Sequence, residues 1–261
     1  MRDILSDLQA AATNPIEAAR QASKTPLPKR FYKAVEVLEE DGGFAVGLDG
    51  RAVKTPGRAQ LVLATRDAAQ MLAEEFDAQT EYLDPKHMPV YRLLNTAVDG
   101  VATDPQVVAE DVIRFAGTDL LCYRAGGPDV LVARQSEAWD PVLDWIASRI
   151  GSRFVLAEGV MHVAQPKSAT VGFGVLINQI GDPIQLAALH SMTTLTGSAL
   201  LALAVFEAEM TASEAWAAAH VDEDYNIELW GEDAEAKEMR YWKWTQMDAA
   251  SRMIAALATG R

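Results

Sequence analysis

The stretch from Ile184 to Glu209 constrains the fold most, because its apolar residues fall on more than one side of a helix. One stripe, at spacings of three and four, consists of Leu189, Met192, Leu195, Ala199, Leu203 and Phe206. Further apolar residues widen this stripe: Leu200, Leu201, Ala204 and Val205. A helix that is apolar all round is a buried helix, so the pattern predicts a central helix surrounded by others. Gly197 and Ser198 lie within it, where a helix crossing needs small residues.

The first third of the chain carries the signals of an antiparallel sheet instead. Short runs at residues 31–38, 44–48, 51–55 and 60–63 are predicted as strands, separated by turn residues. Asp49-Gly50 is the strongest turn signal, because both central positions of the favoured hairpin turn need a positive φ. These runs predict a four-stranded antiparallel meander. Thr65 then caps a helix whose apolar stripe would cover the sheet: Ala69, Leu72, Ala73 and Phe76.

Beyond residues 85–105 the pattern is largely helical. Three Asp-Pro pairs are predicted as an N-cap and first helical residue: Asp104-Pro105, Asp140-Pro141 and Asp182-Pro183. Gly151 and Gly181 are predicted to end helices, and one short extended piece is expected at 154–156 or 160–164. A last helix, Tyr241 to Leu257, closes the bundle. The predicted fold class is α+β, with a tail or linker at 1–29, a small antiparallel β-rich domain at 30–100 and an all-α helical-bundle domain at 101–261.

Charge and composition exclude several classes of function. A net charge of −14 argues against nucleic acid and against an anionic membrane surface, since both need clustered Lys and Arg. The longest apolar run, Ala199 to Phe206, is far shorter than the roughly 20 residues of a membrane span. The start of the chain lacks the apolar core of a secretory signal, and the single cysteine, Cys122, suits a reducing compartment and a core position. We therefore expect a cytoplasmic protein without membrane insertion.

Residues 220–235, HVDEDYNIELWGEDAE, are the candidate functional stretch. The helix that carries them is predicted to start at Thr211, with Glu214 completing a capping box. One face of that helix is formed by Trp216, Ala219, Glu223, Ile227 and Trp230. Two interpretations of Glu223 stay open. It is either a carboxylate at the core edge, paired with an arginine or a cap, or part of a surface that presents carboxylates and tryptophans to a protein partner.

Residue patterns that would support catalysis are mostly missing. The four histidines show no metal-ligand spacing, and His190 is interpreted as a satisfied core histidine. Gly172-Phe173-Gly174 lacks the third glycine of a dinucleotide fingerprint, and no phosphate-binding loop motif occurs. Asp222, Glu223 and Glu228 could act as acid and base or hold a hard cation. Neither a nucleophile nor a second set of ligands joins them, so an interface is the favoured interpretation and no catalytic residue, metal or cofactor is assigned.

Motifs spread from about residue 30 to the end of the chain carry a resemblance to a known family. In the first half it is carried by Arg30-Phe31-Tyr32-Lys33, Leu48-Asp49-Gly50-Arg51, Val53-Lys54-Thr55-Pro56, Glu75, Gln79, Met88-Pro89 and Asn95-Thr96-Ala97-Val98-Asp99. In the second half it is carried by Thr118-Asp119-Leu120-Leu121-Cys122-Tyr123-Arg124, Gln135, Trp139-Asp140-Pro141, Gly197-Ser198, Asp222-Glu223-Asp224-Tyr225-Asn226 and Trp230-Gly231. The chain resembles the ATP synthase assembly chaperones that act on the F1 α subunit in mitochondria and some bacteria. Phe76 stands where the family usually has tryptophan, and Asn226 where it usually has glutamine.

The resemblance implies a non-enzymatic chaperone that transiently binds the unassembled F1 α subunit and prevents its aggregation before α/β assembly. It also implies a β-rich amino-terminal domain followed by a helical one. We expect a monomer in the bacterial cytoplasm. The residues expected to contact the partner are Asp222, Glu223, Asp224, Tyr225, Trp230, Glu75 and Phe76.

The alternative function is a small-molecule enzyme that uses carboxylates in an inter-domain cleft. Two carboxylates converging on a deep pocket near Met88, Asp119 and Glu223 would favour it, whereas a shallow apolar groove would not.

Overall fold

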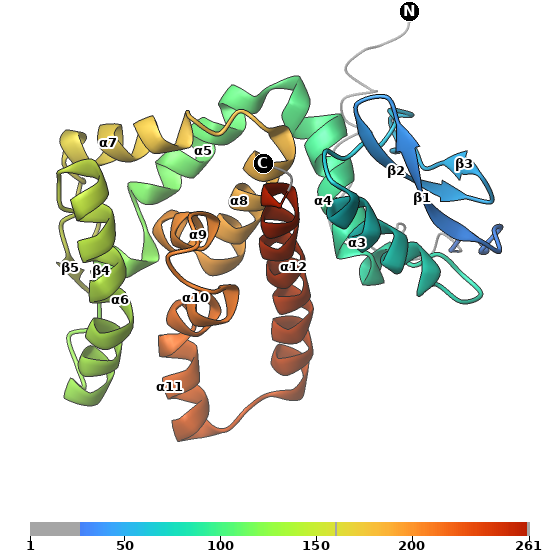
Figure 1. Ribbon diagram of the computed structural model, residues 1–261. Helices are drawn as coiled ribbons and strands as arrows, with labels where there is room; N and C mark the ends of the chain where they lie inside the picture. The colour runs from blue at the N-terminus through green and yellow to red at the C-terminus, as the bar shows by residue number, and fades with distance from the viewer. Residues whose placement is uncertain (1–26, 160, 260–261) are drawn as a thin grey trace, which may run out of the picture.

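The computed structural model describes residues 27–159 and 161–259, and in it short strands give way to helices along the chain (Figure 1). Most of the predicted tail at 1–29 lies outside the described residues. The sheet consists of β1 (Val35–Glu40), β2 (Gly43–Leu48) and β3 (Arg51–Ala52), paired antiparallel in that order. The predicted α+β fold class is confirmed. The domain boundary near residue 100 stays a prediction, and the buried residues form one continuous cluster across it.

The turn between β2 and β3 forms as predicted, with φ of 48° at Asp49 and 77° at Gly50. The Asp49 carboxylate accepts hydrogen bonds from the N–H groups of Lys33 (3.1 Å) and Ala34 (2.8 Å), and these bonds lower its pKa. Because those N–H groups are taken by a side chain, β1 begins at Val35 rather than at residue 31. Asp49 and Gly50, which the resemblance includes, therefore have a structural role.

The fourth predicted strand is wrong. Residues 60–63 contribute only the isolated bridges Lys54↔Gln60 and Phe44↔Leu63. The turn before them is bonded to Asp99, whose carboxylate accepts from the Thr55 hydroxyl (2.6 Å) and the Gly57 N–H (2.8 Å). A segment anchored in this way pairs at single points and forms no continuous ladder.

The helix α3 (Arg66–Asp77) covers the sheet, and its predicted cap and stripe are confirmed. The Thr65 hydroxyl accepts from the Ala68 N–H and donates to the Ala256 carbonyl (2.9 Å). The predicted stripe residues Ala69, Leu72, Ala73 and Phe76 are all buried. The chain continues through the short helical segments η1 (Pro85–His87), α4 (Pro89–Asn95), η2 (Thr96–Gly100) and η3 (Val101–Thr103).

The remaining elements form the helical part of the molecule. They are α5 (Pro105–Ala116), η4 (Leu120–Cys122), β4 (Tyr123–Arg124), α6 (Asp129–Ile150), β5 (Ala157–Glu158), α7 (Lys167–Ile177), α8 (Pro183–Thr196), α9 (Ala199–Phe206), α10 (Ala212–Ala219), α11 (Val221–Trp230) and α12 (Ala234–Ala258). The expected extended piece is β5, between the two predicted positions and parallel to β4. The closing helix α12 begins seven residues earlier than predicted.

Some of the Asp-Pro and glycine predictions for helix ends are confirmed and others are wrong. Asp104 and Asp182 cap α5 and α8 as expected, and Gly151 ends α6 with φ of 67°. The prediction for Asp140-Pro141 is wrong, because Pro141 lies inside α6. A proline inside a helix costs about 3 kcal/mol of stability. Packing of α6 against the core offsets this cost, notably at Trp139, which is fully buried and donates to the Ala218 carbonyl. The prediction for Gly181 is also wrong, since α7 ends at Ile177.

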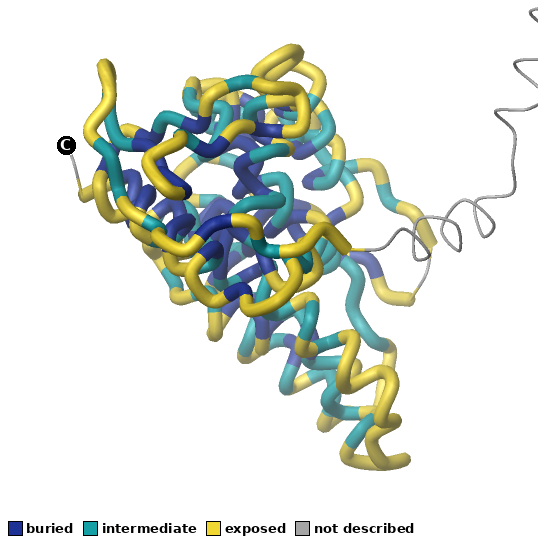
Figure 2. Tube along the Cα trace, turned by 90° about the vertical axis from the view of Figure 1, so that its right-hand side faces the viewer, coloured by how far each residue is buried: buried dark blue, intermediate teal, exposed yellow. Residues whose placement is uncertain are grey.

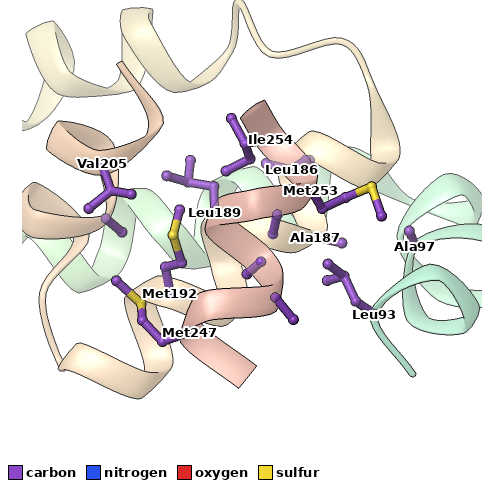
Figure 3. Packing of buried hydrophobic residues seen from close by; sticks show 14 of the residues in the cluster. Leu93, Ala97, Leu186, Ala187, Leu189, Met192, Val205, Met247, Met253 and Ile254 are labelled. Carbon is purple, nitrogen blue, oxygen red and sulfur yellow. The ribbon is translucent and has the colours of Figure 1, made fainter. Parts of the chain in front are cut away.

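The apolar stretch from 184 to 209 is buried at the centre of the molecule, as predicted, but it is two helices rather than one. Gly197 takes a left-handed φ of 70° and ends α8, and the Ser198 hydroxyl accepts from the Leu201 N–H (3.0 Å) to start α9. Leu186, Leu189 and Met192 of α8 pack against Met247, Met253 and Ile254 of α12 (Figure 3). The break therefore turns the chain inside the core.

A buried carboxylate holds this break in place. Asp119 is fully buried and accepts from the N–H groups of Leu121 and Leu200, both at 3.1 Å. Its burial raises its pKa to about 6. The adjacent Cys122 is buried as predicted, and burial raises the pKa of its thiol to about 12. No helix in residues 27–159 and 161–259 is long and apolar enough to cross a bilayer.

Candidate interaction surface

The acid-rich stretch does not continue one helix, which corrects the predicted face. The capping box of Thr211 and Glu214 forms as expected, but α10 ends at Ala219 and α11 begins at Val221. His220 is the joint between them, and its ring Nδ1 lies 2.7 Å from the Trp216 carbonyl. The break changes the direction of the helix axis, so the residues after it face a different environment. Trp216 is 9% exposed, whereas Trp230 is 84% exposed. Helical spacing could not reveal this, because it assumes an unbroken axis.

The α11 helix lies on the surface and is held there by polar contacts with α6. None of its residues is buried, and the end of the molecule where α11 turns into α12 is largely exposed (Figure 2). Asp222 accepts from the Gln135 amide (2.7 Å). Arg134 donates to Glu228 (2.8 Å) and lies over the Tyr225 ring at 5.6 Å. The hydrogen bond from Arg134 lowers the pKa of Glu228.

On the other side, α11 is joined to α12 through Arg240. The Arg240 guanidinium donates to Asp224 and lies 3.9 Å from Glu223, which also lies 3.8 Å from the His220 ring. The side chain of Glu223 is about half exposed. Burial lowers the pKa of His220, so the neutral ring is favoured there. Glu223 is thus loosely paired with an arginine, as the first interpretation has it, and it also faces solvent; its contact with a partner stays a prediction.

Two of the predicted contact residues lie elsewhere, on α3. Glu75 accepts from the N–H groups of Val90 (2.7 Å) and Tyr91 (2.8 Å) at the start of α4, and burial raises its pKa to about 7. Phe76 is 4% exposed, with its ring edge-on to those of Tyr32 and Tyr91. In this conformation Phe76 packs the core and presents no surface to a partner.

A cavity of about 380 Å³ lies at the seam between α3, α4 and α12, and we call it the seam pocket. Its lining includes Glu74 and Glu75 of α3, His87 and Val90 around the start of α4, and Tyr241, Trp244, Asp248 and Arg252 of α12. Tyr241 follows Arg240 directly, so the first turns of α12 contact the acidic helix and also line the seam pocket. Glu75 therefore lines a pocket on α12, the same helix that contacts α11.

Sequence reasoning missed the α12 residues of this surface. Arg240, Tyr241 and Trp244 stand within the run Lys237 to Trp244, which mixes basic and aromatic residues. That mixture is the sequence signal that could have indicated an interaction surface. The closing helix was predicted from Tyr241 to Leu257 with no surface role, because nothing in the sequence indicates that Tyr241 is 68% exposed.

The residues named for the enzymatic alternative do not converge. Asp119 is buried and its oxygens bond backbone N–H groups, Met88 is buried, and Glu223 lies on the surface beside Arg240. Within the described part of the chain, no three His, Cys, Asp or Glu side chains are grouped to hold a metal. His190 is paired with Asp111 at 2.9 Å but is one-third exposed, so it is satisfied without being a core residue. The arrangement can support recognition of a protein surface by carboxylates and aromatic rings.

Comparison with known proteins gives one consistent family. The family model described as ATP12 chaperone protein matches residues 29–147. The mitochondrial protein atp12 of Schizosaccharomyces pombe is 21% identical over 233 residues, covering 83% of this chain and 80% of that protein.

Two solved structures share both fold and sequence with this chain. A putative chaperone from Agrobacterium tumefaciens is 51% identical, with a TM-score of 0.85, covering 95% of this chain and 93% of that one. Atp12 from Paracoccus denitrificans is 36% identical, with a TM-score of 0.81, covering 90% of this chain and 99% of that one. The likeness therefore extends well beyond the residues matched by the family model.

Proposed function

This chain belongs to the ATP12 chaperone family, and from that premise we propose that it binds the unassembled F1 α subunit of ATP synthase and prevents its aggregation before α/β assembly. It is an assembly chaperone and not an enzyme. An unassembled subunit exposes apolar surface that is normally covered by its neighbour, and such surface aggregates. We further propose that it acts in the bacterial cytoplasm, as its bacterial relatives suggest, and that it acts as a monomer.

The observation that carries this proposal is the surface formed by α11 and the start of α12. Asp222, Glu223 and Asp224 stand in its first turn, with Tyr225 and the exposed Trp230 beyond them. Aromatic side chains anchor protein interfaces, and charges at the rim select the partner and speed its approach. A chain with a net charge of −14 favours a client surface that carries basic residues.

Release of the client is proposed to occur without nucleotide hydrolysis. No nucleotide-binding motif is found in the sequence, so release occurs when the assembly partner competes for the same surface. Affinity for the client therefore stays below that of the final subunit contact. An interface of exposed carboxylates and single aromatic anchors suits this requirement, because surface charge pairs contribute little free energy each.

The test is charge reversal at Glu223. Purified α subunit is incubated with the wild type, with Glu223→Lys, and with Glu36→Lys as a control at an exposed position of β1. We expect Glu223→Lys to lose capture of the α subunit and suppression of its light scattering, while the control keeps both. Thermal unfolding of each variant is measured in parallel. Full retention of binding by a stably folded Glu223→Lys protein would overturn the assignment of this surface.

A further inference from the structure

The seam pocket gathers three carboxylates from two helices that are far apart in the sequence. Glu74 and Glu75 come from α3 and Asp248 from α12. Two rings of α12 complete the wall, the exposed Tyr241 and the partly buried Trp244. A cavity of about 380 Å³ lies within the range of sites that hold small groups, and it is large enough for one long side chain with water.

The cations around the seam pocket have other partners, although the charges of Arg92 and Arg252 also act on Glu75 and lower its pKa in part. Arg252 lies 3.7 Å from Asp248, and Arg92 lies over the Trp242 ring at 5.0 Å. His87 and Lys86 are paired with Asp84 (3.0 Å) and Glu238 (3.9 Å). Within the described residues, Glu75 has no cationic side chain within 4.0 Å, and its hydrogen bonds come from backbone N–H groups. The pocket therefore holds more negative than positive charge.

Burial of Glu75 disfavours its ionised form and raises its pKa to about 7. A cation entering the pocket would relieve that cost, because an opposite charge within about 4–6 Å stabilises the carboxylate. The Tyr241 and Trp244 rings add a face that attracts cations and an apolar wall for an aliphatic stem. These groups are what a guanidinium on a three-carbon stem requires.

We propose that the seam pocket is the socket for one arginine side chain of the client subunit. The proposal rests on the proposed function and deepens it, since it names the chemistry of one client residue. Arginine fits better than lysine, because its planar group can stack on an aromatic ring while it donates to more than one carboxylate. The acidic helix and the seam pocket then flank α12, where Arg240 contacts α11 and Tyr241 lines the pocket.

The first experiment tests the socket without the client. N-acetyl-arginine amide is titrated into the protein at pH 8, and the indole N–H resonance of Trp244, assigned with a Trp244→Phe variant, is followed by NMR. The neutral isostere N-acetyl-citrulline amide is the matched ligand control. We expect a saturable shift with arginine and none with citrulline. Equal shifts with both, or no shift with arginine, would overturn the proposal.

Two variants test the walls of the pocket. Glu75→Gln removes the charge and keeps an oxygen that can accept from Val90 or Tyr91. Tyr241→Ala removes an exposed ring and leaves the core intact. Glu36→Gln serves as the control. We expect the first two to lose the arginine shift and the control to keep it, with all three folded by circular dichroism. An undiminished shift in Glu75→Gln and in Tyr241→Ala would contradict the assignment.

Capture of purified α subunit separates this proposal from the one that it rests on. We expect Glu75→Gln and Tyr241→Ala to bind about tenfold more weakly than the wild type, the loss expected for one charge-assisted contact. Unchanged capture by both variants would overturn the socket and leave the chaperone function intact. A wild type that captures no α subunit would instead overturn the proposed client.

Discussion

The molecule holds its carboxylates in two contrasting settings. On α11 the carboxylates are partly or fully exposed; Glu223, Asp224 and Glu228 stand beside arginines, and the bond from Arg134 lowers the pKa of Glu228. In the interior, Asp119 and Glu75 accept backbone N–H groups, and burial raises their pKa values to about 6 and about 7. The interior pair fixes chain turns at the cost of desolvation, whereas the α11 acids cost little and remain available to a partner. Asp119 thus serves architecture, Glu75 caps α4 and also lines the seam pocket, and the α11 acids are proposed to serve recognition.

The largest effect that distinguishes the two regions is expected at Asp119. Asp119→Ala leaves the N–H groups of Leu121 and Leu200 buried without acceptors, at about 1–3 kcal/mol each. We expect the free energy of unfolding at pH 8 to fall by about 3 kcal/mol, measured by urea denaturation. Asp119→Asn, which keeps one oxygen, is the control and should lose about half as much. An unchanged midpoint in Asp119→Ala would show that the interior acid does not hold the α8–α9 break.

The next effect is the pH dependence that Glu75 gives to the free energy of unfolding. Its folded pKa of about 7 lies above its ordinary value of 4.5, so the folded state holds the proton more tightly than the unfolded state. The contribution to stability is therefore present below pH 4.5 and lost as pH rises to about 7, by about 3 kcal/mol at 1.36 kcal/mol per unit.

The measurement is the difference in unfolding free energy between the wild type and Glu75→Gln at several pH values. This difference removes the parallel contribution of Asp119, whose folded pKa is also raised. We expect the difference to change in favour of Glu75→Gln between pH 4.5 and 7 and to stay level above pH 8. A difference that does not vary with pH would show that Glu75 ionises freely and that the interior setting has been misjudged.

Local signals in the sequence predicted much of the fold. Thr65, Asp104, Asp182 and Thr211 were identified as caps because each N-cap hydrogen bond is made within three residues. The buried helix pattern was also predicted, since burial of an apolar stripe does not depend on how its helices are connected. Failures arose where distant contacts decide the outcome. Pro141 stays helical because the buried Trp139 holds α6, and residues 60–63 do not form a strand because Asp99 holds the preceding turn.

The candidate site was predicted only in part for the same reason. The acids and Trp230 of α11 stand close in the sequence, so their clustering was visible. The seam pocket was not, because it joins Glu75 to Tyr241 and Trp244 across more than 160 positions. Phe76 was selected through the family resemblance, and its role as a client contact stays a prediction that its burial does not support.

A smaller effect is expected at the Arg240–Asp224 pair, which belongs to the exposed setting. Both side chains are partly exposed, and such pairs contribute between about 0 and 1 kcal/mol. We expect Asp224→Asn to lower the unfolding free energy by less than about 1 kcal/mol. Adding salt to about 0.5 M should reduce that loss, because salt screens exposed charges. The check is a double-mutant cycle with Arg240→Gln at two salt concentrations. A coupling above about 3 kcal/mol would place this pair with the interior acids instead.

The smallest effect on stability is expected at Trp230, where the loss should appear in binding alone. Its ring is 84% exposed, and substitutions at such sites change stability by about 0.5 kcal/mol or less. An exposed tryptophan next to carboxylates is a typical interface anchor, so Trp230→Ala should weaken capture of the α subunit by tenfold or more, about the cost of a hot-spot truncation. Leu229→Ala is the neighbouring control, also exposed and apolar. If Trp230→Ala lowers stability by more than about 1 kcal/mol, the ring is packed in solution, and α11 serves the fold as the interior acids do.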